Sequence, residues 1–170
     1  MPNYMWGIDS RTTKCYEPIS LFDIQRLVDT GRLDPTKLID ITALINARLL
    51  EPADLLWSED IHGLRLVADG ANELAQPLNI EMQMADKDAI AAVERMGGQY
   101  YSSYYDHQSI QIAVNPIDFF LSGKAMKKRE LPPNHLWEYY RDGEQRGYLA
   151  TPGAVMSGRL ALAKVISKYF

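Results

Sequence analysis

The stretch LNIEMQMADKDAIAAVERMGGQYYSSYYDHQSIQIAV, residues 78–114, decides the fold class of this 170-residue chain. Apolar and polar side chains alternate at its start, which predicts a strand over residues 78–84 with one buried face. Asp86 follows at a predicted helix N-cap, where its carboxylate accepts unpaired backbone N–H groups. Apolar residues then recur every three or four positions up to the Gly97-Gly98 pair, which predicts a helix ending there. A strand followed so closely by a helix indicates an α/β fold.

The second half of this stretch is predicted to be extended. Residues 99–105 are rich in tyrosine, and Ile110, Ile112 and Val114 alternate with other side chains as in a strand. The Asp106-His107 pair between the two segments is interpreted as a turn. The residues expected to be buried together in one hydrophobic cluster are Ile80, Ile90, Val93 and Ile112.

Further elements are predicted on either side. Ser20 begins a variant of the capping box, and apolar residues follow at helical spacing until Gly31, which predicts a helix over this range. Asp40 is the expected N-cap of a second, shorter helix. Residues 64–68 predict a short strand, and residues 153–170 predict a closing helix.

Two of these segments resemble one protein family. A strand that leads into a short Ala-rich helix ending in Gly-Gly is the hallmark of the L-fifteen family of large-subunit ribosomal proteins, in the C-terminal domain of its animal mitochondrial form. The residues that match this hallmark are Ala85, Ala89, Ile90, Glu94, Gly97 and Gly98. PISLFDIQRLVDTGRLDPTKLIDITALINAR, residues 18–48, is similar to an upstream segment of the mitochondrial members. The residues that match there are Gly31, Arg32, Asp34, Pro35, Ile39 and Asp40.

The C-terminal part of the chain adds a third match. It resembles an extension that the mitochondrial members carry and the bacterial members lack. The matching motifs are Phe119-Phe120-Leu121, Gly123, Lys128-Arg129, Leu131-Pro132-Pro133, Tyr139-Tyr140 and Arg146-Gly147-Tyr148-Leu149-Ala150. The resemblance therefore covers roughly residues 17–153, with the motifs in family order.

The resemblance implies a fold and a division of the chain. The expected fold is α/β, a small irregular stack of β-β-α units as in the L-fifteen and L-eighteen-e proteins, with an extended helical C-terminal arm. The expected parts are a loose N-terminal arm at 1–17, a globular α/β domain at 18–116, and a basic C-terminal extension with helices at 117–170.

The resemblance also implies a structural role without catalysis. The expected protein is a component of the mitochondrial large ribosomal subunit in the matrix, in contact with ribosomal RNA and neighbouring ribosomal proteins, with no cofactor. The family's long Gly- and Arg-rich N-terminal half is not found in these 170 residues. We therefore expect either a fragment or a shortened chain, or a protein without that function, and weak RNA binding with little sequence preference.

Charge is distributed unevenly along the chain. Residues 1–123 hold 9 Lys and Arg against 18 Asp and Glu, whereas residues 124–170 hold 9 against 4. The basic part is the expected contact surface for a polyanion. Its densest segment, KAMKKR, supplies four candidate contacts to RNA phosphates. These candidates are Lys124, Lys127, Lys128 and Arg129; the competing interpretation is a solvated basic loop.

Two apolar segments flank this basic run. Apolar segments that stay exposed usually mark interfaces, so both are candidates for docking on other proteins. These docking candidates are Phe119, Phe120, Leu121, Leu131, Pro132 and Pro133. Residues 100–105 offer tyrosine rings that can stack on bases, although one face of this run is expected in the core.

Two other functions remain open from the sequence. An adaptor outside the ribosome would fit the acidic body, and a small hydrolase would use Asp106 and His107. A nucleophile-elbow Gly-x-Ser-x-Gly, a phosphate loop and metal-ligand spacing are not found in the sequence, so no metal site is expected. The chain has one cysteine and no run of about 20 apolar residues, so neither an internal disulfide nor a membrane span is expected.

Overall fold

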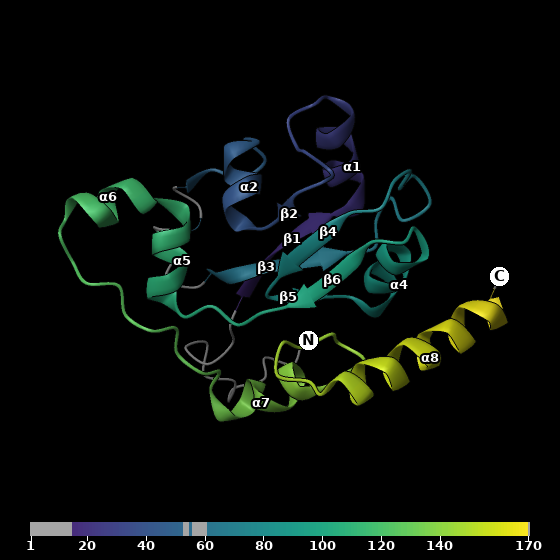
Figure 1. The fold of residues 1–170 in the computed structure, drawn as a ribbon. Coiled ribbons are helices and arrows are strands. Elements are labelled where there is room, and N and C mark those ends of the chain that lie inside the picture. The colour runs from purple at the N-terminus through teal and green to yellow at the C-terminus, as the bar shows by residue number, and fades with distance from the viewer. Residues whose placement is uncertain (1–14, 53–54, 56–60, 170) are drawn as a thin grey trace, which may run out of the picture.

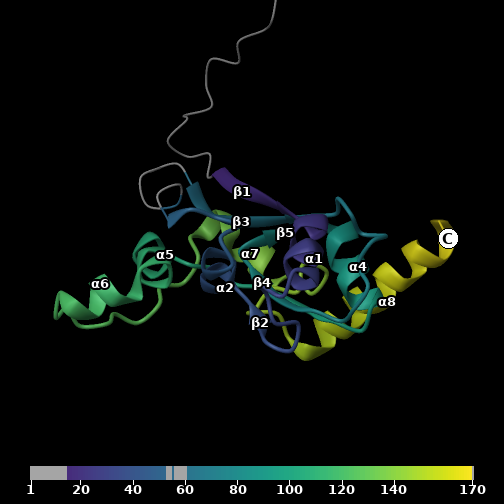
Figure 2. The same cartoon turned by 90° about the horizontal axis from the view of Figure 1, so that it is seen from above.

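The computed structural model describes residues 15–52, 55 and 61–169. Small parallel sheets lie at the centre with helices around them (Figure 1). Helix α6 lies at one end of the molecule and helix α8 at the opposite end in both views (Figures 1 and 2). The predicted α/β class with C-terminal helices is confirmed, whereas the predicted division at residues 17 and 116 stays a prediction.

The strands form two three-stranded parallel sheets. The first sheet has the order β1-β3-β5, with β1 at Cys15–Ser20, β3 at Ile61–Val67 and β5 at Met84–Ala85. The second has the order β2-β4-β6, with β2 at Leu38–Ile39, β4 at Asn79–Met82 and β6 at Gln99–Ser102. Parallel partners require crossover connections, and helices supply most of them. The strands predicted at 64–68 and 78–84 thus correspond to β3 and to β4 with β5.

The first two helices begin where their caps predict. Helix α1 spans Leu21–Asp29, and the Ser20 hydroxyl accepts a hydrogen bond from Asp23 N at 3.0 Å. Helix α2 spans Ile41–Asn46, and the Asp40 carboxylate accepts one from Ala43 N at 2.8 Å. Both caps satisfy backbone donors that have no partner within the helix.

Helix α4, Lys87–Arg95, is confirmed with Asp86 at its N-cap position, but the predicted capping hydrogen bond is not formed. The Asp86 backbone has the extended N-cap conformation, yet its side chain makes no capping hydrogen bond. The carboxylate instead accepts bonds from Arg65 Nε and Nη2 at 3.0 and 2.5 Å. An ionised partner on the neighbouring strand β3 therefore replaces the backbone amides.

The strand predicted over Ile110–Val114 is wrong, because helix α5 occupies His107–Val114. Ile110 and Val114 are buried, but Ile112 is only half-buried and lies outside the main cluster. A spacing of four residues fits one helical face as well as one strand face. Asp106, predicted in a turn, stands at the N-cap position and accepts a hydrogen bond from Ser109 Oγ. Ile80, Ile90 and Val93 are fully buried together, as predicted.

The C-terminal part holds three more helices: α6 at Pro116–Leu121, α7 at Asn134–Arg141 and α8 at Pro152–Tyr169. The closing helix predicted at 153–170 is α8; Phe170 lies outside the described residues, as do residues 1–14 of the predicted arm. No helix within the described ranges has both the length and the hydrophobicity needed to span a membrane.

Helix α7 is attached to the sheets by tyrosines. The Tyr140 hydroxyl is buried and donates to the Gln83 carbonyl at 2.9 Å, and Ala85 N donates to the Tyr139 hydroxyl at 3.2 Å. The Tyr140 ring also makes edge contacts with the rings of Tyr104 and Tyr148, at centroid distances of 5.9 and 5.7 Å. Burial raises the pKa of Tyr140 well above its ordinary value, so the hydroxyl stays neutral.

A buried ion pair makes a second attachment. The Arg146 side chain is 2% exposed, and its Nε and Nη2 donate to the Glu94 carboxylate of α4 at 2.7 and 2.9 Å. The same segment extends the β6 edge, because Tyr148 N donates to the Ser102 carbonyl and Ser102 N donates to the Arg146 carbonyl, each at 3.0 Å. The C-terminal part is thus fixed to the sheets on both sides of the loop at residues 142–145.

Candidate nucleic-acid interface

The basic loop, residues 122–130, follows α6 in the connection to α7, and each of its residues is exposed. Within the described part of the chain, Lys124, Lys127 and Lys128 make no hydrogen bond or ion pair. Three cations without a protein partner, within five residues, keep their charge available for an external anion. The sequence-based candidates therefore lie on one solvent-facing segment.

Arg129 differs from the three lysines. Its guanidinium lies 4.1 Å from the ring centroid of Tyr105, a cation–π contact. The Tyr105 hydroxyl donates to Glu81 at 2.7 Å, and burial, together with this bond, raises the pKa of Tyr105 to about 12. Arg129 thus holds the end of the basic loop against the globular body.

The apolar candidates are placed unequally. On α6, Phe120 and Leu121 are 64% and 80% exposed, whereas Phe119 is half-buried. The rings of Phe119 and Phe120 make an edge contact, with their centroids 5.7 Å apart. Ile117, which the sequence interpretation missed, is exposed on the same helix. In the second segment Leu131 is exposed, Pro132 is buried and Pro133 is half-buried at the start of α7.

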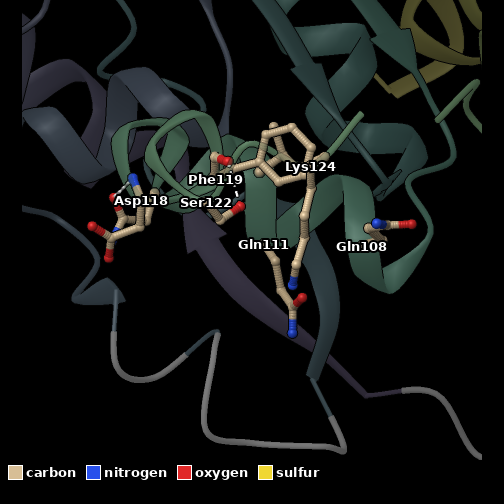
Figure 3. A pocket seen from close by; sticks show the side chains of 8 residues that line it. Gln108, Gln111, Asp118, Phe119, Ser122 and Lys124 are labelled. Atoms are coloured by element: carbon tan, nitrogen blue, oxygen red, sulfur yellow. Dashed lines mark hydrogen bonds between the residues drawn. The ribbon is translucent and has the colours of Figure 1, made fainter. Parts of the chain in front are cut away.

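An open cavity of about 290 Å³ lies between α5 and α6 (Figure 3). Most of its lining side chains are polar, and it brings together one phosphate candidate and one docking candidate. Its lining residues are Gln108, Gln111, Ile112, Asn115, Asp118, Phe119, Ser122 and Lys124. The α5–α6 cavity was missed because α5 was predicted to be a strand; Gln108 and Gln111, three residues apart, share a face only in a helix.

The tyrosines of β6 and the following segment are divided. Tyr100 is buried and accepts a hydrogen bond from Ser102 Oγ at 3.0 Å. Tyr101 is exposed, and its hydroxyl donates to Gln99 at 2.6 Å. Tyr101 also borders a second cavity of about 330 Å³ with Tyr148. Tyr100 therefore belongs to the core, whereas Tyr101 faces solvent.

The residues of the hydrolase hypothesis lie at the start of helix α5, where their side chains contact one another or other residues of the helix. Ser109 donates to Asp106, and Nε2 of His107 lies 2.9 Å from Nε2 of Gln111. The contact of His107 is therefore with an amide, which does not activate a nucleophile as a serine–histidine pair does. In the described residues, no group of three or more His, Cys, Asp and Glu side chains is arranged to hold a metal ion.

Comparisons with known proteins agree on one family. Residues 18–100 match a family model described as "Ribosomal proteins 50S-L15, 50S-L18e, 60S-L27A". A protein of Danio rerio, named "Large ribosomal subunit protein uL15m", is 40% identical over 164 residues, which cover 96% of this chain and 54% of that protein. A protein of the same name from Neurospora crassa is 28% identical over 153 residues, covering 78% of this chain and 47% of that protein. The chain spans about half the length of these curated relatives.

Proposed function

Because this chain belongs to the L-fifteen family of ribosomal proteins, we propose that it serves as a structural component of the mitochondrial large ribosomal subunit. The observation that carries the proposal is the 40% identity to a protein named for that subunit, over nearly the whole of this chain. The role needs no catalysis, in keeping with a family of ribosomal proteins. The engaged side chains of Asp106 and Ser109 also disfavour the hydrolase alternative.

We propose that the basic loop contacts ribosomal RNA through its phosphates. Support comes from the exposure of the loop and from the absence of protein partners for Lys124, Lys127 and Lys128 within the described residues. The contact of Arg129 with Tyr105 attaches the C-terminal end of the loop to the body, next to Lys127 and Lys128. Phosphate contacts fix position and carry no sequence information, in keeping with a structural role.

We propose that α6 and Leu131 dock on a neighbouring ribosomal protein. Ile117, Phe120 and Leu121 lie on α6, which places no residue in the core, and each is more than 60% exposed. Leu131, in the segment before α7, is 65% exposed. Large apolar side chains that stay exposed are typical of interfaces. Pro132 is buried and Pro133 is half-buried, so we assign the contact in this segment to Leu131.

Salt dependence of RNA binding tests the phosphate contacts. Each contact contributes roughly 0.7 to 0.9 to the slope of log affinity against log salt. Replacing Lys124, Lys127 and Lys128 by Ala should therefore flatten the slope for a large-subunit RNA fragment by about two to three units. The matched control is Lys87→Ala. Lys87 lies outside the basic loop and its ammonium pairs with the Glu144 carboxylate at 2.6 Å, so this variant should leave the slope nearly unchanged. An equal slope for wild type and triple variant would leave the loop as a solvated surface.

Sedimentation of mitochondrial lysates separates the ribosomal role from the adaptor role. We expect the wild-type protein to comigrate with large subunits. Changing both Phe120 and Leu121 to Ser should move it towards the free pool, because docking is lost while no core residue is touched. A wild-type protein found only in the free pool would favour an adaptor outside the ribosome.

A further inference from the structure

We propose that the α5–α6 cavity binds one unpaired nucleotide of RNA, with the base against Phe119 and its phosphate at Lys124. The proposal rests on the proposed RNA contact of the basic loop and adds the kind of RNA that the loop meets. It concerns a bulged or looped-out base rather than a particular sequence.

The size and position of the cavity favour a small group that is attached to a backbone. Its volume of about 290 Å³ is at the lower end of the range for small-molecule pockets, so it accepts a single base but no helix. Lys124 belongs to both the cavity and the basic loop. A strand whose phosphates follow the loop therefore passes the mouth of the cavity.

The lining offers the three contacts that an unpaired nucleotide uses. Phe119 provides an aromatic face, and every base has a π-face to stack on it. Gln108 and Gln111 provide amides, each with a donor and an acceptor suited to a base edge. In Figure 3 the polar ends of Gln111 and Lys124 point to the same side of the cavity.

These amides retain hydrogen-bonding capacity. Among the described residues, Gln108 has no hydrogen-bond partner, and Gln111 uses only its Nε2, which lies 2.9 Å from His107 Nε2. Asn115 differs, because its side chain caps α6 and donates to Asp118 at 2.5 Å. The amides with unused hydrogen-bonding capacity are thus on α5, and the Asn115 amide, which is engaged, is at the N-cap of α6.

Other occupants fit this lining less well. Asp118 is the only carboxylate among the lining residues, and hard cations need several oxygen ligands. An apolar side chain of a partner protein would cover the six polar side chains of the lining without forming hydrogen bonds to them. Asp118 itself accepts the Asn115 amide, which moderates its repulsion of a phosphate.

The α5 wall is fixed in advance. Ile110 and Val114 are buried in the body, and Thr42 Oγ1 donates to the Ala113 carbonyl at 2.9 Å. Gln108 and Gln111 are therefore presented by a helix that cannot turn without disrupting the core. Preorganisation of this kind lowers the entropic cost of binding.

Two RNA hairpins test the proposal. The two hairpins have the same stem and loop, and one of them contains in addition a single unpaired 2-aminopurine. The fluorescence of this base falls when it stacks. We expect the wild-type chain to bind the bulged hairpin at least fivefold more tightly than the paired one and to quench the probe. Phe119→Ala should remove the preference, since stacking on one aromatic ring corresponds to roughly a five- to hundredfold effect.

Matched variants make the result specific. Phe120→Ala alters a neighbouring ring outside the cavity lining and should keep the preference. Gln111→Ala should reduce it without removing the aromatic face. No residue of α6 is buried, so these α6 variants should melt at the wild-type temperature.

Two outcomes would overturn the proposal. One is equal affinity of the wild-type chain for both hairpins; the other is a preference that survives in Phe119→Ala. The affinity for the paired hairpin, and the slope of its logarithm against log salt, test the phosphate contacts of the basic loop independently of the cavity. Salt-dependent binding without bulge preference would thus reject the nucleotide site and leave the proposed RNA contact intact, whereas no binding to either hairpin would reject both.

Discussion

Replacing Glu94 by Gln should destabilise the protein by about 3 kcal/mol. Glutamine keeps the size of the side chain and one acceptor but removes the charge opposite Arg146, which is 2% exposed. Breaking a buried pair from one side costs roughly 3–5 kcal/mol, because an uncompensated charge stays in the interior. The Glu94 side chain is 18% exposed, and Arg146 keeps the Gly143 carbonyl at 2.6 Å as an acceptor, so we expect the low end.

Equilibrium unfolding in urea, followed by circular dichroism, measures this loss. Arg159→Gln is the control, because Arg159 lies 3.6 Å from the same carboxylate but is 47% exposed. Surface pairs of this kind contribute less than about 1 kcal/mol. The double variant Glu94→Gln, Arg146→Met should be less destabilised than the sum of its single variants, because the unpaired charge is gone. A Glu94→Gln variant no less stable than Arg159→Gln would refute the reasoning.

Three further predictions concern the body. Ile90→Ala should lower the free energy of unfolding by about 2–5 kcal/mol, because the side chain is fully buried; a urea midpoint close to wild type would contradict its central place. Asp40→Ala should cost about 0.5–2 kcal/mol through loss of the α2 cap, and Asp40→Asn, which keeps an acceptor, should cost less in the same assay. Burial raises the pKa of Tyr16 and of Tyr105 from 10.0 to about 12, so the fold favours their neutral forms. Stability from these two tyrosines should be complete below pH 10 and lost as the pH rises through about 12, and tyrosinate absorbance that appears together with unfolding in an alkaline titration checks this.

The caps of α1 and α2 and the position of helix α4 are local features, so the sequence predicts them well. Ser20 and Asp40 cap their helices through atoms only three residues away, which a sequence pattern records directly. The prediction of a strand at α5 was wrong because the apolar residues at 110, 112 and 114 have the spacing of a strand, whereas only 110 and 114 are buried. The Asp106-x-x-Ser109 spacing, which resembles a helix N-terminus, was the signal that separates the two possibilities.

Contacts between residues far apart in the sequence could not be predicted, because no local pattern records them. The basic count of residues 124–170 includes Arg146, yet this arginine is buried and neutralised by a glutamate 52 positions earlier. Asp86 was expected to cap its own helix but binds Arg65 on β3. The α5–α6 cavity likewise depends on a contact between two helices, so sequence patterns indicate Lys124 and Phe119 as separate candidates and not as one site.

The parallel pairing of the strands has a consequence for how the chain folds as it is synthesised. Glu17 in β1 is aligned with Leu64 in β3, and β3 in turn pairs with Met84 in β5. Strand β1 therefore cannot pair until several later elements have been synthesised. Such long closures slow folding and leave strand edges exposed in the nascent chain. The segment around Gly147, which pairs with the β6 edge, is synthesised after every strand of the two sheets. We therefore expect nascent chains that end before residue 102 to bind chaperones, and the basic loop to take its final place only once the body behind it is complete.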